Sequence, residues 1–454
     1  MEYDLGIIGA GPAGYVAAER AGHAGLKVVM FEKDNIGGVC LNEGCIPTKT
    51  LLYVAKLYDN AKNSELYGLQ CKSISFDFQQ IMKRKNRVVR KLRGGVDVKM
   101  KTNNVEVVKE HVTIDGKEKK LIRLSTGNNK WECKNILIST GSLPVIPPIK
   151  GLKRSEICTN KEILEIENLP ESLIIIGGGA IGIEFAGFFS SMGTKVSVFE
   201  IMPEILPGTD KEIAGMLKKE LEKKGVDFYL NSRVKEIKSG KDARIAIAES
   251  EGKQIEVSAE TLLVSVGREP VIKGFGLENI GVITEKGRIP VDEKCLTNIP
   301  NVYAAGDVTG KSFLAHTASR QGEVAVNNIA GVKDLMRYNA IPSVIYTNPE
   351  IASVGINEEE AQKRNIKYKK GSLPMAYSGR FIAENEGKNG LIKIIAGEKY
   401  GEILGVHMIG NPTSEIIYGV AAMIEAELRI KDIREIVFPH PTVSEIIREA
   451  VFSF

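Results

Sequence analysis

Two stretches of this sequence repeat each other. DLGIIGAGPAGYVAAERAGHAGLKVVMFE (residues 4–32) and SLIIIGGGAIGIEFAGFFSSMGTKVSVFE (residues 172–200) align at one constant offset of 168 residues. Each copy contains an apolar run, a GxGxxG turn, a helical pattern, a second apolar run and a closing glutamate. This order predicts a strand, a tight turn, a helix and a second strand. A chain with two such units is expected to be an α/β protein with two Rossmann-like domains.

The glycines of both copies match the dinucleotide-binding fingerprint. The first glycine makes the turn, the second lets the backbone approach a pyrophosphate, and the third lets the helix pack closely against the strand. The closing acids, Glu32 and Glu200, stand where a carboxylate binds a ribose hydroxyl. We therefore expect two dinucleotide sites, for which flavin plus nicotinamide is the common pairing. The six glycines concerned are Gly9, Gly11, Gly14, Gly177, Gly179 and Gly182.

The second site favours NAD over NADP. The ten residues after Glu200, IMPEILPGTD, contain no lysine or arginine. A 2′-phosphate would be repelled by the Glu200 carboxylate and would find no cation in this stretch.

The stretch GGVCLNEGCIPTK (37–49) places two cysteines five residues apart, at Cys40 and Cys45. Five residues span about 7.5 Å along a helix and roughly 16 Å along a strand, whereas a disulfide joins Cα atoms about 4.4–6.8 Å apart. The chain must therefore bend between the cysteines, which Gly44 and Asn42 permit.

The same stretch predicts a helix that begins near Cys45. Pro47 fits the first turn of that helix, and the helix dipole would stabilise a thiolate at Cys45. A zinc site would need two further ligands, and the neighbouring sequence supplies none. We expect a reversible dithiol/disulfide and no metal site.

Composition limits the other possibilities. The net charge of +4 is too small to indicate nucleic acid or an anionic membrane, and no apolar run reaches the roughly 18 residues of a membrane span. The basic run KRKNRVVRKLRGG (83–95) has helical spacing and no aromatic residues, which is typical of a solvated helix face. Without a signal peptide, we expect a cytoplasmic location. The other cysteines are expected to be small buried residues: Cys71, Cys133, Cys158 and Cys295.

Three later apolar runs end in glycine-containing turns: residues 134–142, 261–270 and 298–308. The last includes Asp307, which either binds a sugar-like chain or belongs to an ordinary turn. A helix is expected over 312–331. From residue 341 the pattern changes to strands mixed with helices around 357–364 and 413–427, which indicates an α+β domain.

Together these motifs resemble the FAD-dependent pyridine nucleotide–disulfide oxidoreductases, and within them the dihydrolipoamide dehydrogenases. The resemblance covers essentially the whole chain and rests on both fingerprints, GGVCLNEGCIPTK, STGS, VSVGREP, VYAAGD and HPTVSE. It implies two Rossmann-like domains, for FAD and NAD, plus a C-terminal α+β dimerisation domain. The implied boundaries are an FAD domain at 1–143, an NAD domain at 144–269, a second FAD segment at 270–338 and the dimerisation domain at 339–454.

The resemblance also implies the cofactor residues. Asp307 matches the acid bound to the ribityl chain of FAD, Lys49 a lysine near the reactive edge of the flavin, and Glu184 the acid that pairs with this lysine. Matching positions assign FAD to Gly9, Gly11, Gly14, Glu32, Thr140, Gly141 and Ala315. They assign NAD to Gly177, Gly179, Gly182, Glu200 and Gly267.

For catalysis, the resemblance implies that Cys45 lies against the flavin and that Cys40 exchanges with substrate. His440 matches a base and Glu445 the acid that orients it, both reaching the active site from the other subunit of a homodimer. Many relatives have a second histidine where this chain has Phe438, which we interpret as altered packing.

The function implied is oxidation of protein-bound dihydrolipoyl groups with NAD. The expected partners are lipoyl-bearing proteins of 2-oxoacid dehydrogenase or glycine cleavage systems, with no nucleic acid and no membrane. Alternatives are a glutathione reductase, which generally uses NADPH, or a mercuric reductase, which carries a C-terminal cysteine pair. An NADH:quinone or NADH:oxygen oxidoreductase would not need two cysteines, and a non-catalytic flavoprotein would have no reason to keep them.

Overall fold

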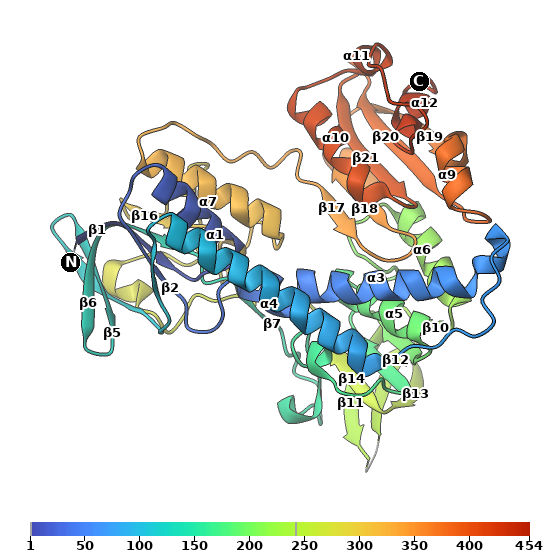
Figure 1. Cartoon of the computed structure of the whole chain (residues 1–454), viewed down its shortest axis with the longest axis horizontal. Helices are drawn as coiled ribbons and strands as arrows, with labels where there is room; N and C mark the ends of the chain where they lie inside the picture. The colour runs from blue at the N-terminus through green and yellow to red at the C-terminus, as the bar shows by residue number, and fades with distance from the viewer. Residues whose placement is uncertain (1, 241–242) are drawn as a thin grey trace. The chain divides into compact units, whose positions relative to one another are not determined.

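The computed structural model describes residues 2–240 and 243–454, and it divides into two compact units (Figure 1). The first unit consists of Met1–Thr50, Met82–Val145 and Gly267–Arg337. The second consists of Leu51–Ile81, Ile146–Val266 and Tyr338–Phe454. One glycine fingerprint therefore lies in each unit.

The first unit is built on a seven-stranded sheet of β1 (Glu2–Ile8), β2 (Val28–Phe31), β3 (Glu106–Val108), β4 (Thr113–Glu118), β5 (Leu121–Thr126), β6 (Asn129–Ile138) and β16 (Val302–Ala304). The order is β3-β2-β1-β6-β5-β4, with β16 paired to β6. Strands β3, β2, β1, β6 and β16 run parallel, and β4 to β6 form an antiparallel meander. Strands β1, β2, β6 and β16 are rich in buried apolar residues, as strands covered on both faces require.

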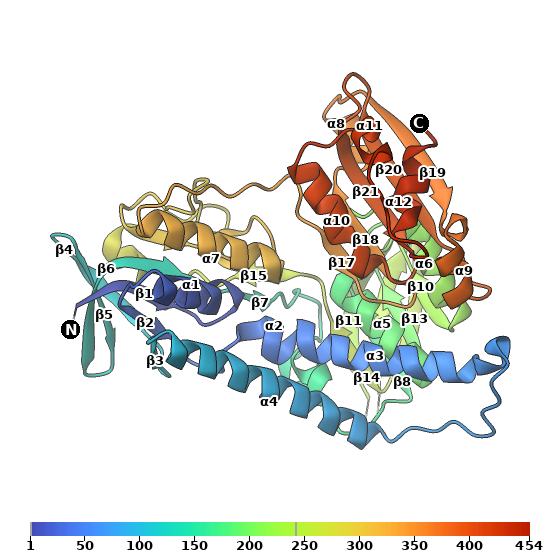
Figure 2. The ribbon, with the colours of Figure 1, turned by 45° about the horizontal axis from the view of Figure 1, so that its top comes forward.

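Four helices accompany this sheet: α1 (Pro12–His23), α2 (Gly38–Glu43), α7 (Ala315–Ile329) and most of α4 (Phe78–Thr102). Helix α3 (Cys45–Lys62) begins in the first unit. Helices α1 and α7 lie side by side (Figures 1 and 2). Gly322 permits this approach, because a Cβ there would lie 2.5 Å from the carbonyl oxygen of Ala13. Short elements complete the unit: β7 (Ser142–Pro144), β15 (Arg268–Pro270), η4 (Leu277–Ile280) and η5 (Asp307–Thr309).

The second unit contains a four-stranded parallel sheet of β8 (Ser172–Ile176), β9 (Lys195–Phe199), β10 (Val226–Tyr229) and β14 (Thr261–Val264). Its order is β10-β9-β8-β14. The sheet shares an apolar core with an antiparallel sheet of β11 (Ser232–Ser239), β12 (Arg244–Ser250) and β13 (Lys253–Ala259). The helices of this part are α5 (Ala180–Met192), α6 (Lys211–Lys223), η1 (Ser64–Tyr67), η2 (Arg154–Glu156) and η3 (Glu162–Glu165).

The C-terminal part of the second unit has a five-stranded antiparallel sheet in the order β17-β18-β21-β20-β19. Its strands are β17 (Ser343–Ile345), β18 (Ile351–Gly355), β19 (Tyr368–Pro374), β20 (Leu391–Gly397) and β21 (Ile403–Ile409). Its helices are α8 (Glu358–Lys363), α9 (Gly379–Glu384), α10 (Thr413–Glu425), α11 (Ile430–Arg434), α12 (Glu445–Val451) and η6 (Met375–Tyr377).

The expected fold class is confirmed: each repeated fingerprint connects parallel strands of its own sheet, and an α+β part follows residue 341. The helix expected over 312–331 is α7, and those expected near 357–364 and 413–427 are α8 and α10. Within the described ranges, no helix is long and apolar enough to cross a membrane.

Candidate active site

The first glycine turn joins β1 to α1 and leaves no room for side chains at two of its glycines. Gly9 has φ +100°, and a Cβ there would lie 2.4 Å from the carbonyl oxygen of Ser139. A Cβ on Gly14 would lie 1.9 Å from the Gly9 oxygen. The Glu32 carboxylate closes the turn, because its Oε2 accepts a hydrogen bond from Ala10 N–H at 2.8 Å. Helix α1 begins directly after this turn, which is the arrangement that binds a pyrophosphate.

The second turn, between β8 and α5, repeats this geometry. Gly177 has φ +111°, and its Cβ would lie 2.5 Å from the oxygen of Ser265. A Cβ on Gly182 would lie 2.1 Å from the Gly177 oxygen. The buried Glu200 accepts a hydrogen bond from Gly178 N–H at 2.6 Å. The 168-residue repeat is thus a repeat of structure as well as of sequence.

The middle glycine of each turn faces open space. No atom lies within 4 Å of a Cβ built on Gly179, and a Cβ on Gly11 would meet only the Gly38 Cα, at 3.9 Å. The packing of the protein therefore does not require glycine at either position. Close approach of a ligand does require it, so both cradles fit a dinucleotide.

Two serines brace these turns and were not identified from the sequence. Ser139 Oγ donates a hydrogen bond to the Gly9 oxygen at 2.8 Å, and Ser265 Oγ donates one to the Gly177 oxygen at 3.1 Å. Each serine directly follows an apolar strand and stands two residues before a glycine of positive φ, Gly141 or Gly267. The matching triplets STG (139–141) and SVG (265–267) could have identified both serines from the sequence.

Gly44 separates the two helices that carry the cysteine pair. Its non-helical torsion angles are φ −147° and ψ −108°, and it stands between α2, which contains Cys40, and α3, which begins at Cys45. The side chain of Cys40 forms a hydrogen bond with that of Cys45, and this bond together with burial raises the pKa of the Cys40 thiol. The predicted bend is confirmed, and it brings the two sulfur atoms together as free thiols.

Lys49 lies one turn into α3, and its charge has the opposite effect on the pKa of the Cys40 thiol. Its positive charge lowers the pKa of Cys40, although less than the contact with Cys45 raises it. Pro47 lies in the first turn of α3, as the sequence predicts.

Asp307 lies at the start of η5 in a cluster that joins distant parts of the first unit. Ser142 Oγ donates a hydrogen bond to an Asp307 carboxylate oxygen at 2.5 Å. Arg268 in turn donates two hydrogen bonds to Ser142: Nε to the side-chain Oγ at 2.8 Å, and Nη2 to the backbone oxygen at 2.7 Å. Burial raises the pKa of Asp307, whereas Ser142 and Arg268 lower it. Ser142 and Arg268 are part of this cluster and were not singled out from the sequence.

The remaining predicted residues of the first site are two residues of the turn before Ser142 and the first residue of α7. Thr140 Oγ1 donates to the carbonyl oxygen of Val271 at 2.7 Å, and Gly141 accepts from Val271 N–H at 2.9 Å. Ala315 is the first residue of α7.

His440 and Glu445 contact each other at the beginning of α12. His440 Nδ1 lies 2.9 Å from Glu445 Oε1, while Thr442 N–H donates to Glu445 Oε2 at 2.9 Å. The Thr442 bond, and then the His440 bond, hold the pKa of Glu445 below its usual value. The imidazole is 80% exposed, so its Nε2 edge is open to another molecule. Ser444, the N-cap residue, makes no side-chain capping bond.

Glu184 lies buried in α5, where its Oε1 accepts a hydrogen bond from Tyr346 N–H at 3.0 Å. Glu184 belongs to the second unit and Lys49 to the first, so their pairing stays a prediction.

One expectation about the other cysteines is wrong. Cys133 and Cys295 are buried and Cys158 is partly buried, but Cys71 is exposed. Cys71 lies between η1 and α4, in a stretch that has no helix or strand to cover it.

Comparison with known families agrees with this geometry. The family model described as "Pyridine nucleotide-disulphide oxidoreductase" matches residues 3–322, and the model for the dimerisation domain of the same family matches residues 341–451. The chain belongs to this family.

Members of the family with similar sequences include dihydrolipoyl dehydrogenases. The enzyme of Geobacillus stearothermophilus is 39% identical, over 99% of this chain and 96% of its own length. One from Bacillus subtilis is 38% identical, over 100% of this chain and 98% of its own length.

Among solved structures, a HOCl-induced flavoprotein disulfide reductase from Escherichia coli, in a Cu(II) complex, is similar with a TM-score of 0.88 and 28% identity. The match covers 100% of this chain and 99% of that one. LpdA from Mycobacterium tuberculosis has the same fold, with a TM-score of 0.92, 24% identity and coverage of 99% and 98%.

Proposed function

We propose that this protein is a dihydrolipoyl dehydrogenase, which oxidises protein-bound dihydrolipoyl groups with NAD. The observation that carries this proposal is the contact between the Cys40 and Cys45 thiols at the start of α3. A pair of adjacent thiols can alternate between dithiol and disulfide. The full-length similarity to dihydrolipoyl dehydrogenases supports a dihydrolipoyl group as the substrate of this pair.

The two glycine cradles are the sites for the dinucleotides. FAD is assigned to the first, with Glu32, Asp307 and the N-terminus of α7 at Ala315, and NAD to the second, with Glu200. The buried Glu200 carboxylate would repel a 2′-phosphate, which supports NAD over NADP. When bound, FAD supplies the two-electron relay between the dithiol and NAD.

The protein's own part in the reaction is thiol–disulfide exchange and proton transfer. His440 takes the proton of a dihydrolipoyl thiol, and the resulting thiolate attacks Cys40 Sγ, breaking the Cys40–Cys45 bond and forming a mixed disulfide. The second substrate thiol closes the lipoyl ring and releases the Cys40 thiol. The substrate loses two electrons and two protons, and the enzyme pair becomes a dithiol. Glu445 holds the imidazole ring in position through Nδ1.

His440 and Glu445 are assigned to the active site of the partner subunit in a homodimer. The dimerisation-domain match over residues 341–451 supports the homodimer. The 80% exposure of the His440 side chain within one chain agrees with a role at another surface.

Lys49 and Glu184 are assigned to one ion pair beside the flavin, and Thr140, Gly141 and Gly267 to turns against the dinucleotides. The proposed division is an FAD domain at 1–143 and 270–338, an NAD domain at 144–269 and a dimerisation domain at 339–454. The separate sheets of these segments support the division.

The proposed partners are lipoyl-bearing proteins of 2-oxoacid dehydrogenase or glycine cleavage systems. The proposed location is the cytoplasm, because a dithiol that cycles with substrate works in a reducing compartment.

Replacing Cys45 with serine tests the proposal. We expect the Cys45→Ser variant to bind FAD normally, as measured by flavin absorbance per chain, and to lose dihydrolipoamide oxidation by about a thousandfold or more, because the exchange lacks its second sulfur. The exposed Cys71 offers the matched control, and Cys71→Ser should retain wild-type activity. Substantial dihydrolipoamide oxidation by Cys45→Ser would contradict the proposal.

A further inference from the structure

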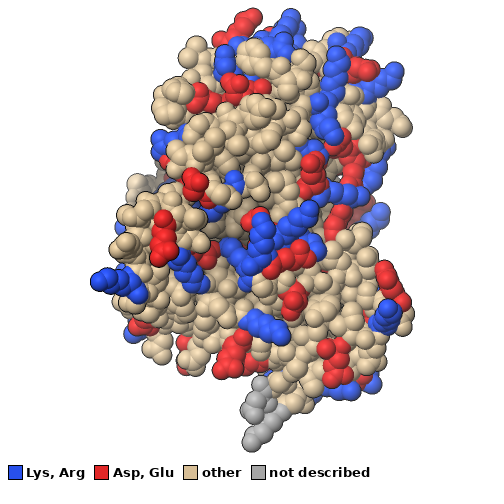
Figure 3. Space-filling view, turned by 90° about the vertical axis from the view of Figure 1, so that its right-hand side faces the viewer, with Lys and Arg blue, Asp and Glu red and all other residues tan. Residues whose placement is uncertain are grey.

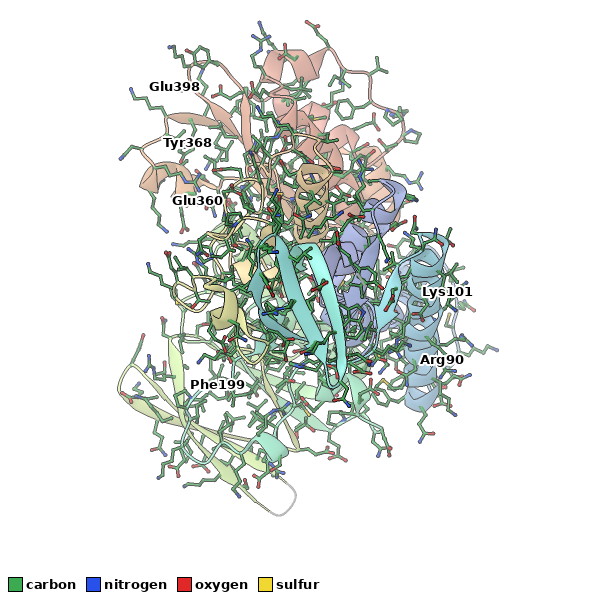
Figure 4. All side chains as sticks on the ribbon, turned by 90° about the vertical axis from the view of Figure 1, so that its left-hand side faces the viewer. Arg90, Lys101, Phe199, Glu360, Tyr368 and Glu398 are labelled. Carbon is green, nitrogen blue, oxygen red and sulfur yellow. The ribbon has the colours of Figure 1, made fainter. Side chains whose placement is uncertain are left out.

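The basic helix α4 has an inward-facing arginine that its charge pattern does not reveal. Figure 3 shows basic and acidic side chains interspersed on one face of the molecule, which agrees with the small net charge. On α4, Arg87, Lys91 and Arg90, the last labelled in Figure 4, are exposed, as a solvated face predicts. Lys85, in the same basic run, is buried, so the expectation holds for only part of the run. Arg93 is only partly exposed, and its guanidinium binds a residue between the two cysteines.

Arg93 makes a forked contact with Asn42. Its Nε and Nη2 atoms both donate to Asn42 Oδ1, at 3.0 and 2.7 Å. Because the donor is charged, these bonds are stronger than ordinary amide hydrogen bonds. Asn42 lies in α2, two residues after Cys40 and three before Cys45.

The amide nitrogen of Asn42 holds the segment that leads to Cys40. Asn42 Nδ2 donates to the carbonyl oxygens of Gly38, at 2.8 Å, and Ile36, at 3.1 Å. Both ends of the Asn42 amide are therefore engaged, one with α4 and one with the backbone before Cys40.

That backbone lies directly against the first dinucleotide turn. Gly37 and Gly38 have φ of +100° and +59°, and a Cβ on Gly38 would lie 2.6 Å from the Gly11 Cα. A continuous chain of contacts thus runs from Arg93 through Asn42 and Gly38 to Gly11. Any displacement of this segment would move Cys40 relative to the turn.

We propose that Arg93 and Asn42 are positioning residues that keep Cys40 in place beside Cys45 and the first dinucleotide site. Helix α2 has six residues, and a helix this short is not stable by itself. In the disulfide state, the bond between the cysteines fixes Cys40. When that bond opens, the fork from Arg93 to Asn42 remains and still ties α2 to α4. This inference rests on the proposed redox role of the cysteines.

The test compares Arg93→Gln with Arg90→Gln, a control on the same helix whose side chain has no hydrogen-bond or ion-pair partner in the described part of the chain. The reduced holoenzymes are alkylated with iodoacetamide, and the modification of Cys40 is followed by mass spectrometry. The substitution removes the charged hydrogen bonds that hold Asn42, so α2 is held less firmly and Cys40 is more accessible to the reagent. We therefore expect Cys40 to react about tenfold faster in Arg93→Gln. The same variant should lower kcat for dihydrolipoamide about tenfold and leave the KM for NAD unchanged.

Arg93→Lys, which keeps the charge and a donor nitrogen, should partly reverse both effects, the faster alkylation and the lower kcat. Flavin content and the melting temperature of Arg93→Gln should match those of Arg90→Gln. Equal alkylation rates in the two variants would overturn the proposal. A fall in flavin content or melting temperature that accompanies the faster alkylation would also overturn it, since the role would then be general stability.

The outcome is separable from that of the proposed function. The alkylation rate of Cys40 does not depend on which disulfide substrate the enzyme uses. If wild-type protein fails to oxidise dihydrolipoamide, the proposed function fails, and the alkylation comparison still decides the role of Arg93.

Discussion

At the residue scale, the glycines of each turn serve two different purposes. A Cβ on Gly182 would lie 2.1 Å from the Gly177 oxygen, whereas a Cβ on Gly179 would have no atom within 4 Å. Packing therefore requires the third glycine of the fingerprint, whereas the second has a role only in the proposed binding of the ligand.

Alanine substitutions in the second turn should distinguish the effect on packing from the effect on ligand binding. Gly182→Ala should destabilise the protein by about 1–3 kcal/mol, because it overpacks a close contact. Gly179→Ala should keep the wild-type melting temperature and weaken NAD binding by about tenfold or more, because its methyl group occupies the approach of the pyrophosphate. Thermal unfolding and NAD titration measure the two effects. Equal losses of stability in both variants would contradict this distinction.

The residues that sequence reasoning identified are those whose chemistry follows from local spacing. The glycines, Glu32 and Glu200 belong to a fingerprint, and Gly44 follows from the reach of a disulfide. Ser142, Arg268 and the pair of Arg93 with Asn42 act through partners far away in the chain. Spacing within a motif carries no information about such partners, so these contacts could not be predicted.

At the element scale, α2 and α3 show how a break between two helices builds the redox pair. A continuous helix would place residues five apart on different faces. Gly44 interrupts the helix, so that Cys40 ends close to Cys45 at the N-terminus of α3. The break was predictable from the spacing of the cysteines, whereas α2 itself, only six residues long, was not.

The 3₁₀ helix η3, in the second unit, begins at a hydrogen-bonded carboxylate, that of Glu162. Glu162, in η3, accepts hydrogen bonds from Thr159 N–H at 2.8 Å and from Arg154 at 2.5 Å. Burial alone would raise its pKa, but the bonds from Arg154 and Thr159 outweigh burial and lower the pKa from 4.5 to about 2. A carboxylate with a lowered folded-state pKa stabilises the fold above its ordinary pKa, and the contribution is lost as the pH falls towards the lowered value.

Glu162→Gln should therefore show a pH-dependent loss of stability. We expect its melting temperature to lie roughly 1–2 °C below that of the wild type at pH 7, and the gap to close as the pH falls from about 4.5 towards 2. Glu167→Gln, at an exposed residue nearby, is the control and should show no gap. A gap that widens on acidification would contradict a lowered pKa of Glu162 in the folded state.

At the scale of the whole molecule, the proposal makes each active site from two chains. The cysteine pair and the His440–Glu445 pair would come from opposite subunits of the homodimer. A site shared between two chains and a site within one chain predict different activities for a dimer of two different variants.

A heterodimer of Cys45→Ser and His440→Gln chains, isolated with two affinity tags after co-expression, tests the arrangement. One of its sites would combine both substitutions, and the other would have neither. We expect about half of the wild-type activity in the heterodimer and almost none in either variant homodimer. An inactive heterodimer with full flavin content would mean that His440 acts within its own chain.

The most direct test of the central claim is steady-state reduction of NAD by dihydrolipoamide with the purified protein, run beside NADP. The Cys40–Cys45 pair and the buried Glu200 predict rapid reduction of NAD and little reduction of NADP. No reduction of either nucleotide by a flavin-loaded dimer would contradict the dihydrolipoamide assignment and direct the search to other disulfide substrates.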